Sequence, residues 1–145
     1  QLPAIDEELV CVTENDACCV DAIQCLLGCT YGKANLIPRL RGKMAFTFFV
    51  RDENSSAAKA VRLFLKPEAG EGMSRDEYQN YLLNTPYTEL FEVLEPRIAL
   101  PEPARHFASE HCSVCGEYTA EYGLRLQDGK PVCLDCYSAY EREGF

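Results

Sequence analysis

The spacing of apolar residues changes period along the first hundred positions, and each period predicts a different element. Leu9 to Thr13 (LVCVT) are β-prone and of strand length. Asn15 or Asp16 is then available as a helix N-cap, and Gly28 as a left-handed stop. Between them a helical spacing links Cys19, Ala22, Ile23, Leu26 and Leu27. We expect a strand followed by a short buried helix from about Cys18 to Leu27.

Two further apolar runs predict a pair of strands. Met44 to Val50 (MAFTFFV) is apolar and aromatic throughout, as expected of a central strand covered on both faces. Lys59 to Lys66 alternates apolar and basic residues, and the polar insert DENSS separates the two runs. The pattern indicates a hairpin and therefore an antiparallel sheet.

The chain then turns helical and afterwards extended. Ser74 and Glu77 form a capping box that opens a helix through about Leu83, and Thr85-Pro86 predicts the cap and first turn of another. Three prolines between Pro96 and Pro103 remove backbone donors and fix φ. The predicted fold class is α+β, an antiparallel sheet packed with helices. The predicted organisation is a core at 1–95, a proline-rich linker at 96–107 and a cysteine-rich module at 108–145.

The number of cysteines indicates the cellular compartment. Nine cysteines is an odd number, so they cannot all pair within one chain. An unpaired thiol fits a reducing compartment, and we therefore expect a cytoplasmic protein. No apolar run approaches the roughly 20 residues that span a bilayer, and no segment resembles a signal peptide, so we expect no membrane contact.

The most specific motif is a pair of CxxC sequences near the carboxyl end, formed by Cys112, Cys115, Cys133 and Cys136. Two residues between ligands let both sulfurs of a pair reach one ion, and four thiolates suit tetrahedral zinc. A set of four sulfur ligands leaves no open position, so the predicted role of the zinc is structural. Two disulfides or a redox-active CxxC are the alternatives, and the predicted compartment disfavours both. His111 is adjacent to the first pair, where we expect it to be exposed or to support a ligand.

Turn chemistry around these cysteines predicts a treble clef. Gly116 permits a tight knuckle after the first pair, and Asp128-Gly129 supplies a hairpin turn between Tyr118 to Leu126 and Lys130 to Val132. The second pair should then open a helix, whose dipole favours thiolates.

Charge narrows the classes of partner. The net charge is −9, and the segment from Ala108 to Phe145 holds three basic and seven acidic residues, so we expect no nucleic-acid binding. One stretch differs: Lys33, Arg39, Arg41 and Lys43 fall within eleven residues that contain no acidic side chain. This stretch is either a solvated loop or an anion-binding edge, and charge runs are more often surface decoration.

A second group of cysteines accompanies the first predicted helix. Cys18, Asp21 and Cys25 lie on one helical face with Gln24 beside them, opposite the aliphatic stripe. Thiols beside a carboxylate suit a second metal site or a nucleophilic centre. The alternative is that they fill the core, since unpaired cysteine is among the most buried residue types.

Three ordered motifs resemble the FmdE family of formylmethanofuran dehydrogenase: CxVDAIQ at Cys18 to Gln24, GCTYGKAN at Gly28 to Asn35 and GKMAFTF at Gly42 to Phe48. The resemblance implies an α+β core with an auxiliary treble-clef zinc finger, in proteins associated with the molybdenum or tungsten enzyme of one-carbon metabolism in methanogens. It implies Cys18 and Cys29 as catalytic candidates. The cofactor-binding candidates that it implies are Asp21, Gln24, Thr30, Lys33 and Asn35.

The chain departs from that family in two places. Members usually begin with HGHxCPG, and neither His106 nor His111 lies in such a context, so we expect an amino-terminal portion to be missing here. The usual GKGN appears as Gly32-Lys33-Ala34-Asn35, and alanine reaches positive φ less cheaply than glycine. We therefore expect the backbone conformation of this loop to differ from that of the family.

Two functions follow as hypotheses. In the first, an accessory metal-binding subunit or enzyme-like domain binds a second metal, a pterin-type cofactor or a small anionic ligand around Cys18 and Cys29, helped by Lys33. In the second, a non-enzymatic adaptor uses the acidic finger to bind a partner protein or to form a homodimer. The exposed tyrosines Tyr137 and Tyr140 suit such an interface.

Overall fold

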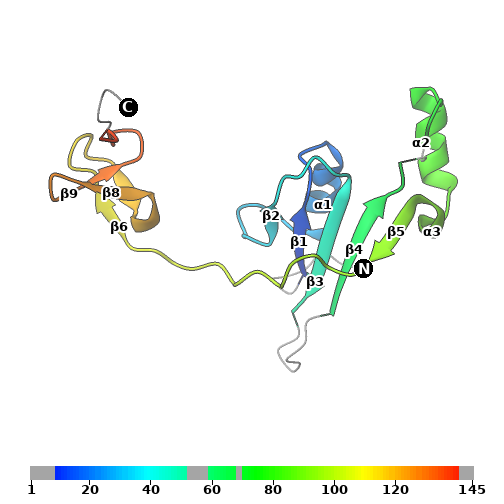
Figure 1. Ribbon diagram of the computed structural model, residues 1–145, viewed down its shortest axis with the longest axis horizontal. Coiled ribbons are helices and arrows are strands. Elements are labelled where there is room, and N and C mark those ends of the chain that lie inside the picture. Colours follow the sequence, from blue (N-terminus) through cyan, green and yellow to red (C-terminus); the bar gives the residue numbers. More distant parts are fainter. Residues whose placement is uncertain (1–8, 52–58, 68–69, 141–145) are drawn as a thin grey trace. The chain divides into compact units, whose positions relative to one another are not determined.

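A computed structural model describes residues 9–51, 59–67 and 70–140 of the chain (Figure 1). The chain divides after Pro103 into two compact units, which we call the core unit and the finger unit. Each unit has its own strands and its own buried residues, and each is described separately below.

The core unit is a five-stranded mixed sheet with the strand order β2-β1-β3-β4-β5. Strand β1 is antiparallel to β3 and parallel to β2, and β3, β4 and β5 pair antiparallel in turn. The antiparallel prediction is therefore correct for all pairs except β1 with β2. The strands are β1 Leu9–Thr13, β2 Leu36–Pro38, β3 Ala45–Val50, β4 Lys59–Leu65 and β5 Phe91–Leu94, and the helices are α1 Cys19–Leu27, α2 Arg75–Asn84 and α3 Tyr87–Leu90.

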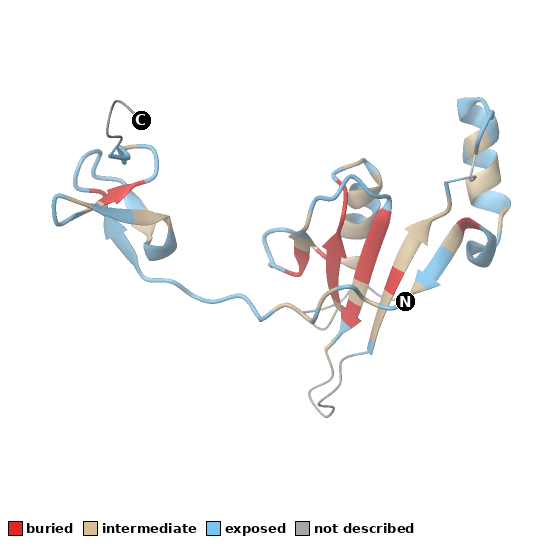
Figure 2. Ribbon diagram, in the orientation of Figure 1, coloured by how far each residue is buried: buried red, intermediate tan, exposed pale blue. Residues whose placement is uncertain are grey.

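Strand β3 is central and covered on both faces, as its uniform apolar run predicts (Figure 2). On one face Phe46 joins Cys11, Cys29 and Leu36 in a buried cluster, against which α1 packs. On the other face Phe49 joins Val10 and Val12. The hairpin from β3 to β4 is confirmed, while the DENSS insert that joins them lies outside the described residues.

A buried ion pair ties β4 to the end of β1. The Arg62 Nε and Nη2 atoms donate to the two carboxylate oxygens of Glu14 at 2.6 and 2.9 Å. Both side chains are almost fully buried, with 1% and 5% of their surface exposed. A bidentate pair of this kind is geometrically specific, and it is costly to break because the remaining charge stays buried.

Helix α1 begins at a different residue from the one that the cap pattern predicts. Cys18 occupies the N-cap without a side-chain hydrogen bond, so the prediction of Asn15 or Asp16 is wrong. The Asn15 Oδ1 atom instead accepts from the Ala17 N–H at 3.1 Å, closing a turn just before the helix. Gly28 ends the helix at φ 68°, as expected for a left-handed stop.

The capping box of α2 is confirmed, because the Ser74 and Glu77 side chains each bond the other's backbone N–H. Thr85 closes α2 instead of capping α3, and Pro86 takes the N-cap position of that short helix. The predicted start of the second helix is therefore one residue early. Among the described residues, no helix is both long and apolar enough to cross a membrane.

Part of the proline-rich segment lies on the core unit. Ile98 and Leu100 pack against the cluster around Val10 and Phe49. The Arg51 Nη2 atom donates to the Pro101 carbonyl at 2.9 Å. These contacts cover the sheet face opposite α1, so this part of the segment belongs to the core.

The finger unit contains two antiparallel hairpins. The first pairs β6 Ser109–His111 with β7 Tyr118–Ala120, and the second pairs β8 Leu124–Gln127 with β9 Lys130–Cys133. Asp128 and Gly129 have φ values of 53° and 75°, which confirms the predicted turn. The single predicted strand from Tyr118 to Leu126 is interrupted by a 3₁₀ turn at Glu121–Gly123, so its two ends pair with different strands.

The helix that the second cysteine pair should open is absent from residues 134–140, which form a turn and then irregular chain. The Tyr137 N–H reaches the Cys133 carbonyl at 2.8 Å, so a single helical turn forms and is not continued. The prediction of a helix here is wrong for these residues, and the treble clef is not confirmed.

Candidate functional site

The first CxxC pair lies in a tight turn between β6 and β7. Cys112 directly follows β6, and its carbonyl accepts from the Gly116 N–H at 2.9 Å. Gly116 has φ 79°, a conformation that costs glycine little and other residues considerably more. The glycine therefore lets the turn fold back so that Cys112 and Cys115 present their sulfurs together.

The second pair comes from the end of β9. Cys133 is the last residue of that strand, and the Cys136 N–H donates to its carbonyl at 3.1 Å in the following turn. All four Sγ atoms lie within 4.8 Å of one another, and Cys115 Sγ is 3.9 Å from Cys133 Sγ. Sulfurs at about 2.3 Å from a tetrahedral zinc would be about 3.8 Å apart. The donor set therefore fits one such ion.

Disulfides do not form in this arrangement, since all nine cysteines are unpaired. The 3.9 Å between Cys115 and Cys133 sulfurs is far from the roughly 2.05 Å of a sulfur–sulfur bond. Within the described residues, the four finger cysteines are also the one group of three or more His, Cys, Asp or Glu side chains with metal-binding geometry. A second metal in the core would therefore need donors that the described residues do not bring together.

Backbone N–H groups prepare one of the sulfurs to be a thiolate. Cys112 Sγ accepts from the N–H groups of Cys133 and Val114 at 3.3 and 3.4 Å. Backbone hydrogen bonds lower the pKa of Cys112 to about 6, and the bond from the Cys133 N–H has the largest effect. In contrast, the neighbouring thiols raise the pKa of Cys136 to about 12, and Cys133 has the largest effect. A bound cation favours the thiolate form, so a metal ion would offset the effect of the neighbouring thiols on Cys136.

His111 supports the knuckle without joining the sulfur cluster. Its Nδ1 atom is 2.8 Å from the Gly116 carbonyl oxygen, and its ring lies 3.9 Å from the Tyr118 ring between centroids. The imidazole therefore connects the end of β6 to the start of β7 across the turn that carries the first pair.

In the core unit, Cys29 and Asn35 are fully buried. The Asn35 Oδ1 atom accepts from the Thr30 N–H at 2.8 Å, and its Nδ2 atom donates to the carbonyls of Leu9 and Gly28 at 3.1 and 3.4 Å. Cys29 Sγ also lies 3.5 Å from the Leu9 carbonyl. Burial raises the pKa of Cys29, although the charge of Lys33 opposes this. Both side chains hold the loop after α1 against β1.

The other candidates lie near the surface of the same region. Cys18 is exposed at the beginning of α1, Asp21 is exposed in its first turn, and Gln24 is half-buried. Thr30 is half-buried and Lys33 is exposed in the loop. Ala34 adopts φ 57°, a left-handed conformation that alanine reaches less cheaply than glycine.

Cys18 opens onto a cavity that Cys29 does not line. The cavity has a volume of about 280 Å³ and is almost entirely apolar. Cys18 and Cys19 contribute from the start of α1, and Tyr78 and Leu82 from α2. The remaining lining residues are Ala17, Met44, Phe46, Leu65 and Phe91. The sequence pattern missed Tyr78 and Leu82, because the capping box locates α2 but does not show which of its faces lines the cavity.

Comparison with known proteins decides the family. Residues 1–95 match the family described as FmdE, Molybdenum formylmethanofuran dehydrogenase operon. The chain belongs to the FmdE family. Residues 107–142 match a second family, the prokaryotic dksA/traR C4-type zinc finger. This second match spans the four cysteines that the structure gathers, so the FmdE-family core is followed in the same chain by a zinc finger.

Two known proteins are similar to this FmdE-family chain over most of its length. A protein of Archaeoglobus fulgidus, named Probable S-adenosyl-L-methionine-binding protein, is 27% identical in an alignment that covers 96% of this chain and 43% of that protein. The chain thus spans less than half the length of that relative. The crystal structure of a tungsten formylmethanofuran dehydrogenase FmdE-like protein from Syntrophus aciditrophicus matches with a TM-score of 0.58 and 22% identity, covering 88% of this chain and 70% of that one. At this identity the likeness supports the fold alone.

Proposed function

We propose that this FmdE-family chain is a zinc protein whose finger is a structural module and whose core binds a small ligand beside Cys18. The observation that carries the proposal is the convergence of four cysteine sulfurs within 4.8 Å. A site of four thiolates suits zinc and leaves no position for substrate, so this zinc would hold the finger together. Any binding or chemistry would then take place in the core unit.

The core cavity supports an organic ligand better than a second metal. Its apolar wall includes the rings of Phe46, Tyr78 and Phe91, which suit a flat ligand of the pterin type. Cys18 is the exposed thiol at its edge, whereas Cys29 is held in the buried cluster. We therefore place the reactive or ligand-contacting role on Cys18, and assign to Cys29 and Asn35 the role of fixing the loop.

The names of the relatives supply candidate ligands for this cavity. The family is named after an operon of molybdenum formylmethanofuran dehydrogenase, and the Archaeoglobus fulgidus relative is named for binding S-adenosyl-L-methionine. We propose that this protein is accessory or related to the molybdenum or tungsten enzymes of one-carbon metabolism, working in the cytoplasm of methanogens or of organisms with related chemistry. A pterin and S-adenosyl-L-methionine are accordingly the two ligands to test first.

Metal analysis combined with ligand titration tests this function. The purified chain should contain one zinc, and the Cys18→Ser and Cys29→Ser variants should keep it. Pterin or S-adenosyl-L-methionine should bind the wild type, and Cys18→Ser should weaken that binding roughly tenfold. A second metal that is lost in the Cys18→Ser variant would contradict an organic ligand at this site. If neither pterin nor S-adenosyl-L-methionine binds, both candidate ligands are contradicted.

A second candidate function is an adaptor that binds a partner protein or a second copy through the finger. The observation in its favour is the number of large apolar side chains that the finger exposes, among them Val114, Tyr122, Leu126 and Leu134 at 66, 69, 76 and 57%. Such a concentration on a small unit is typical of interaction surfaces. Leu126→Ser should then lower the oligomer mass measured by light scattering, while Leu83→Ser, an equally exposed change on α2, should not.

A further inference from the structure

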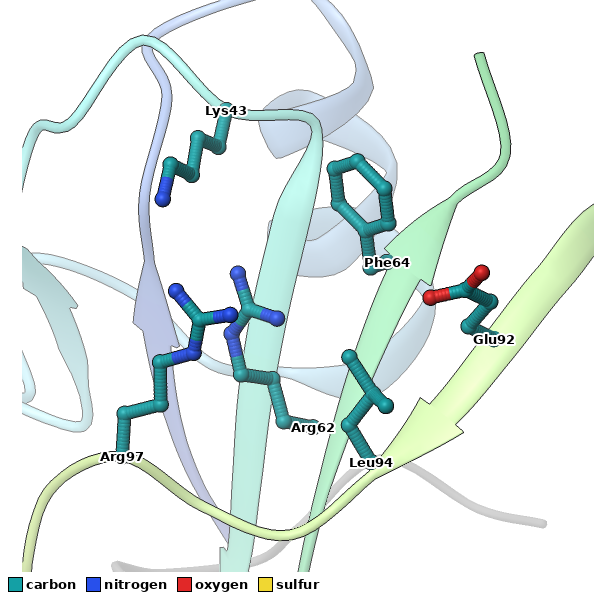
Figure 3. Close-up of a pocket in the computed structure, with 6 residues that line it drawn as sticks. All are labelled: Lys43, Arg62, Phe64, Glu92, Leu94 and Arg97. Carbon is teal, nitrogen blue, oxygen red and sulfur yellow. The ribbon is translucent and has the colours of Figure 1, made fainter. Parts of the chain in front are cut away.

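A second cavity lies on the sheet face opposite α1, and three of its six lining residues are cationic. It has a volume of about 180 Å³ and is lined by Lys43, Arg62, Phe64, Glu92, Leu94 and Arg97 (Figure 3). Arg62, on β4, is paired in register with Thr47 and Leu94, so these residues share the face that carries the Val10 and Val12 cluster. Cys18 does not line this cavity, so it is separate from the site proposed above.

The charge of Arg62 is already compensated in this cavity. Its Nε and Nη2 atoms donate to Glu14 at 2.6 and 2.9 Å, and both partners are buried. The Nη1 atom of Arg62 takes no part in this bidentate pair. The pair therefore forms a fixed, nearly neutral floor of the cavity.

Lys43 and Arg97 add two charges that the floor does not compensate. Both side chains are exposed, and in the described part of the chain neither forms an ion pair. Both lie close enough to Glu14 to contribute to the lowering of its pKa, after the larger effect of Arg62. In Figure 3 they lie on one side of Arg62, while the Glu92 carboxylate lies on the other side, next to Phe64. With Glu14 and Glu92 counted against the three cations, the cavity keeps an excess of one positive charge in a chain of net charge −9.

Apart from Glu92, the remaining wall is apolar. Phe64 and Leu94 come from adjacent strands, and the guanidinium carbon of Arg62 lies 5.7 Å from the centre of the Phe64 ring. A ring fixed in this way offers a flat surface directly beside the cationic group. The cavity therefore combines a place for negative charge with a place for a small hydrophobic body.

We propose that this cavity binds the anionic group of a small organic molecule, a carboxylate or a phosphate, between Lys43 and Arg97, with the apolar part of the molecule against Phe64 and Leu94. Charge-assisted hydrogen bonds to oxyanions are the strongest that such side chains form. Of the basic stretch from Lys33 to Lys43, Lys43 alone lines the cavity. Arg97 reaches it from the proline-rich segment, far away in the sequence.

The test is a titration of the full zinc-bound chain with phenyl phosphate, benzoate and inorganic phosphate, followed by backbone amide NMR. Benzylamine, which has the ring and the opposite charge, is the ligand control. Arg97→Gln and Lys43→Gln each remove one charge from the cavity, and both side chains are exposed, so we expect both variants to fold. Arg75→Gln removes one charge from the exposed face of α2 and serves as the matched control.

The expected result is saturable binding of phenyl phosphate or benzoate, with shifts at Phe64 and Leu94, weakened roughly tenfold by each cavity variant and unchanged by Arg75→Gln. Equal binding by all variants, or equal binding of benzylamine, would overturn the proposal. Inorganic phosphate bound as tightly as phenyl phosphate would overturn the part assigned to Phe64 and Leu94.

Discussion

The core unit and the finger unit stabilise themselves by different means. The core buries two apolar clusters on the two faces of its sheet and adds the Glu14–Arg62 ion pair. Among its described residues, which end at 140, the finger buries a single cluster of Cys112, Val132 and Cys133, and two of these are sulfur ligands. A unit that buries so little apolar surface cannot offset the entropy of folding alone, whereas structural zinc contributes about 10–16 kcal/mol in small modules. The same chain therefore depends on packing in one part and on a metal in the other.

The largest effect should come from removing one sulfur ligand. Cys133→Ser deletes a ligand that is also part of the finger's buried cluster, so the finger should unfold while the core stays folded. Backbone amide NMR of the full chain would show this as collapsed dispersion for the finger residues alone. Cys25→Ser is the matched control, because it replaces an exposed thiol on α1, and it should leave both units intact.

Breaking the buried ion pair should destabilise the core unit and leave the finger unit unchanged. Glu14→Gln leaves Arg62 buried without its partner, which costs about 3–5 kcal/mol of core stability. Denaturant unfolding monitored in the core would measure the loss, and the finger should not respond. Glu95→Gln, an exposed change in charge, should cost less than about 0.5 kcal/mol. Similar losses for both variants would show that the pair contributes little.

The same pair predicts a pH dependence. Hydrogen bonds from Arg62 hold the pKa of Glu14 below its ordinary value of 4.5 in the folded state. The contribution of the pair is therefore complete above that ordinary value and is lost as the pH falls through the lower folded value. Core stability should decrease on acidification below about pH 4.5, and the decrease should be smaller in Glu14→Gln.

Asn35 distinguishes a structural from a ligand-binding role within the core. Asn35→Ala removes three hydrogen bonds and leaves their partly buried backbone partners without that side chain, so we expect a loss of about 3 kcal/mol. Asn80→Ala on the exposed face of α2 should change stability by less than about 0.5 kcal/mol. An unchanged unfolding free energy for Asn35→Ala would instead favour a role in ligand binding.

The smallest effect is a gain. Ala34 is held at φ 57°, where an L-residue with a side chain is strained and glycine is not. Ala34→Gly should therefore stabilise the core by about 0.5–1 kcal/mol, after allowing for the greater flexibility of glycine in the unfolded chain. Ala22→Gly, within α1, should destabilise it by about 1 kcal/mol. Thermal unfolding of the two variants should shift in opposite directions.

Local patterns predicted much of this structure. The helical spacing before Gly28, the apolar run of β3, the capping box at Ser74 and the Asp128-Gly129 turn each depend on neighbouring residues, and each is found where it was expected. The prediction that the first helix is buried is wrong, because α1 has no buried residue and Leu26 is 69% exposed. The paired CxxC spacing likewise indicated the sulfur cluster, because ligand geometry restricts which spacings can share one ion.

Features that depend on distant residues were not predictable from the pattern. β2 has three residues and ends in Pro38, too short a signal for a strand, and it pairs with β1 only because α1 crosses between them. Arg62 alternates with apolar neighbours in the sequence, and its ion-pair partner Glu14 lies 48 positions away, so no local pattern indicates that it is buried. The expected helix after Cys133 failed because the hairpin and the sulfur cluster, not helical propensity, determine the conformation there.

Removing the metal from the intact chain tests the central claim most directly. The zinc-bound protein would be treated with a strong chelator, and amide hydrogen exchange would be followed residue by residue. We expect one zinc per chain, and on its removal a loss of protection in β6 to β9 while β1, β3 and β4 stay protected. Protection that persists in the finger without metal, or that disappears in both units together, would contradict the account.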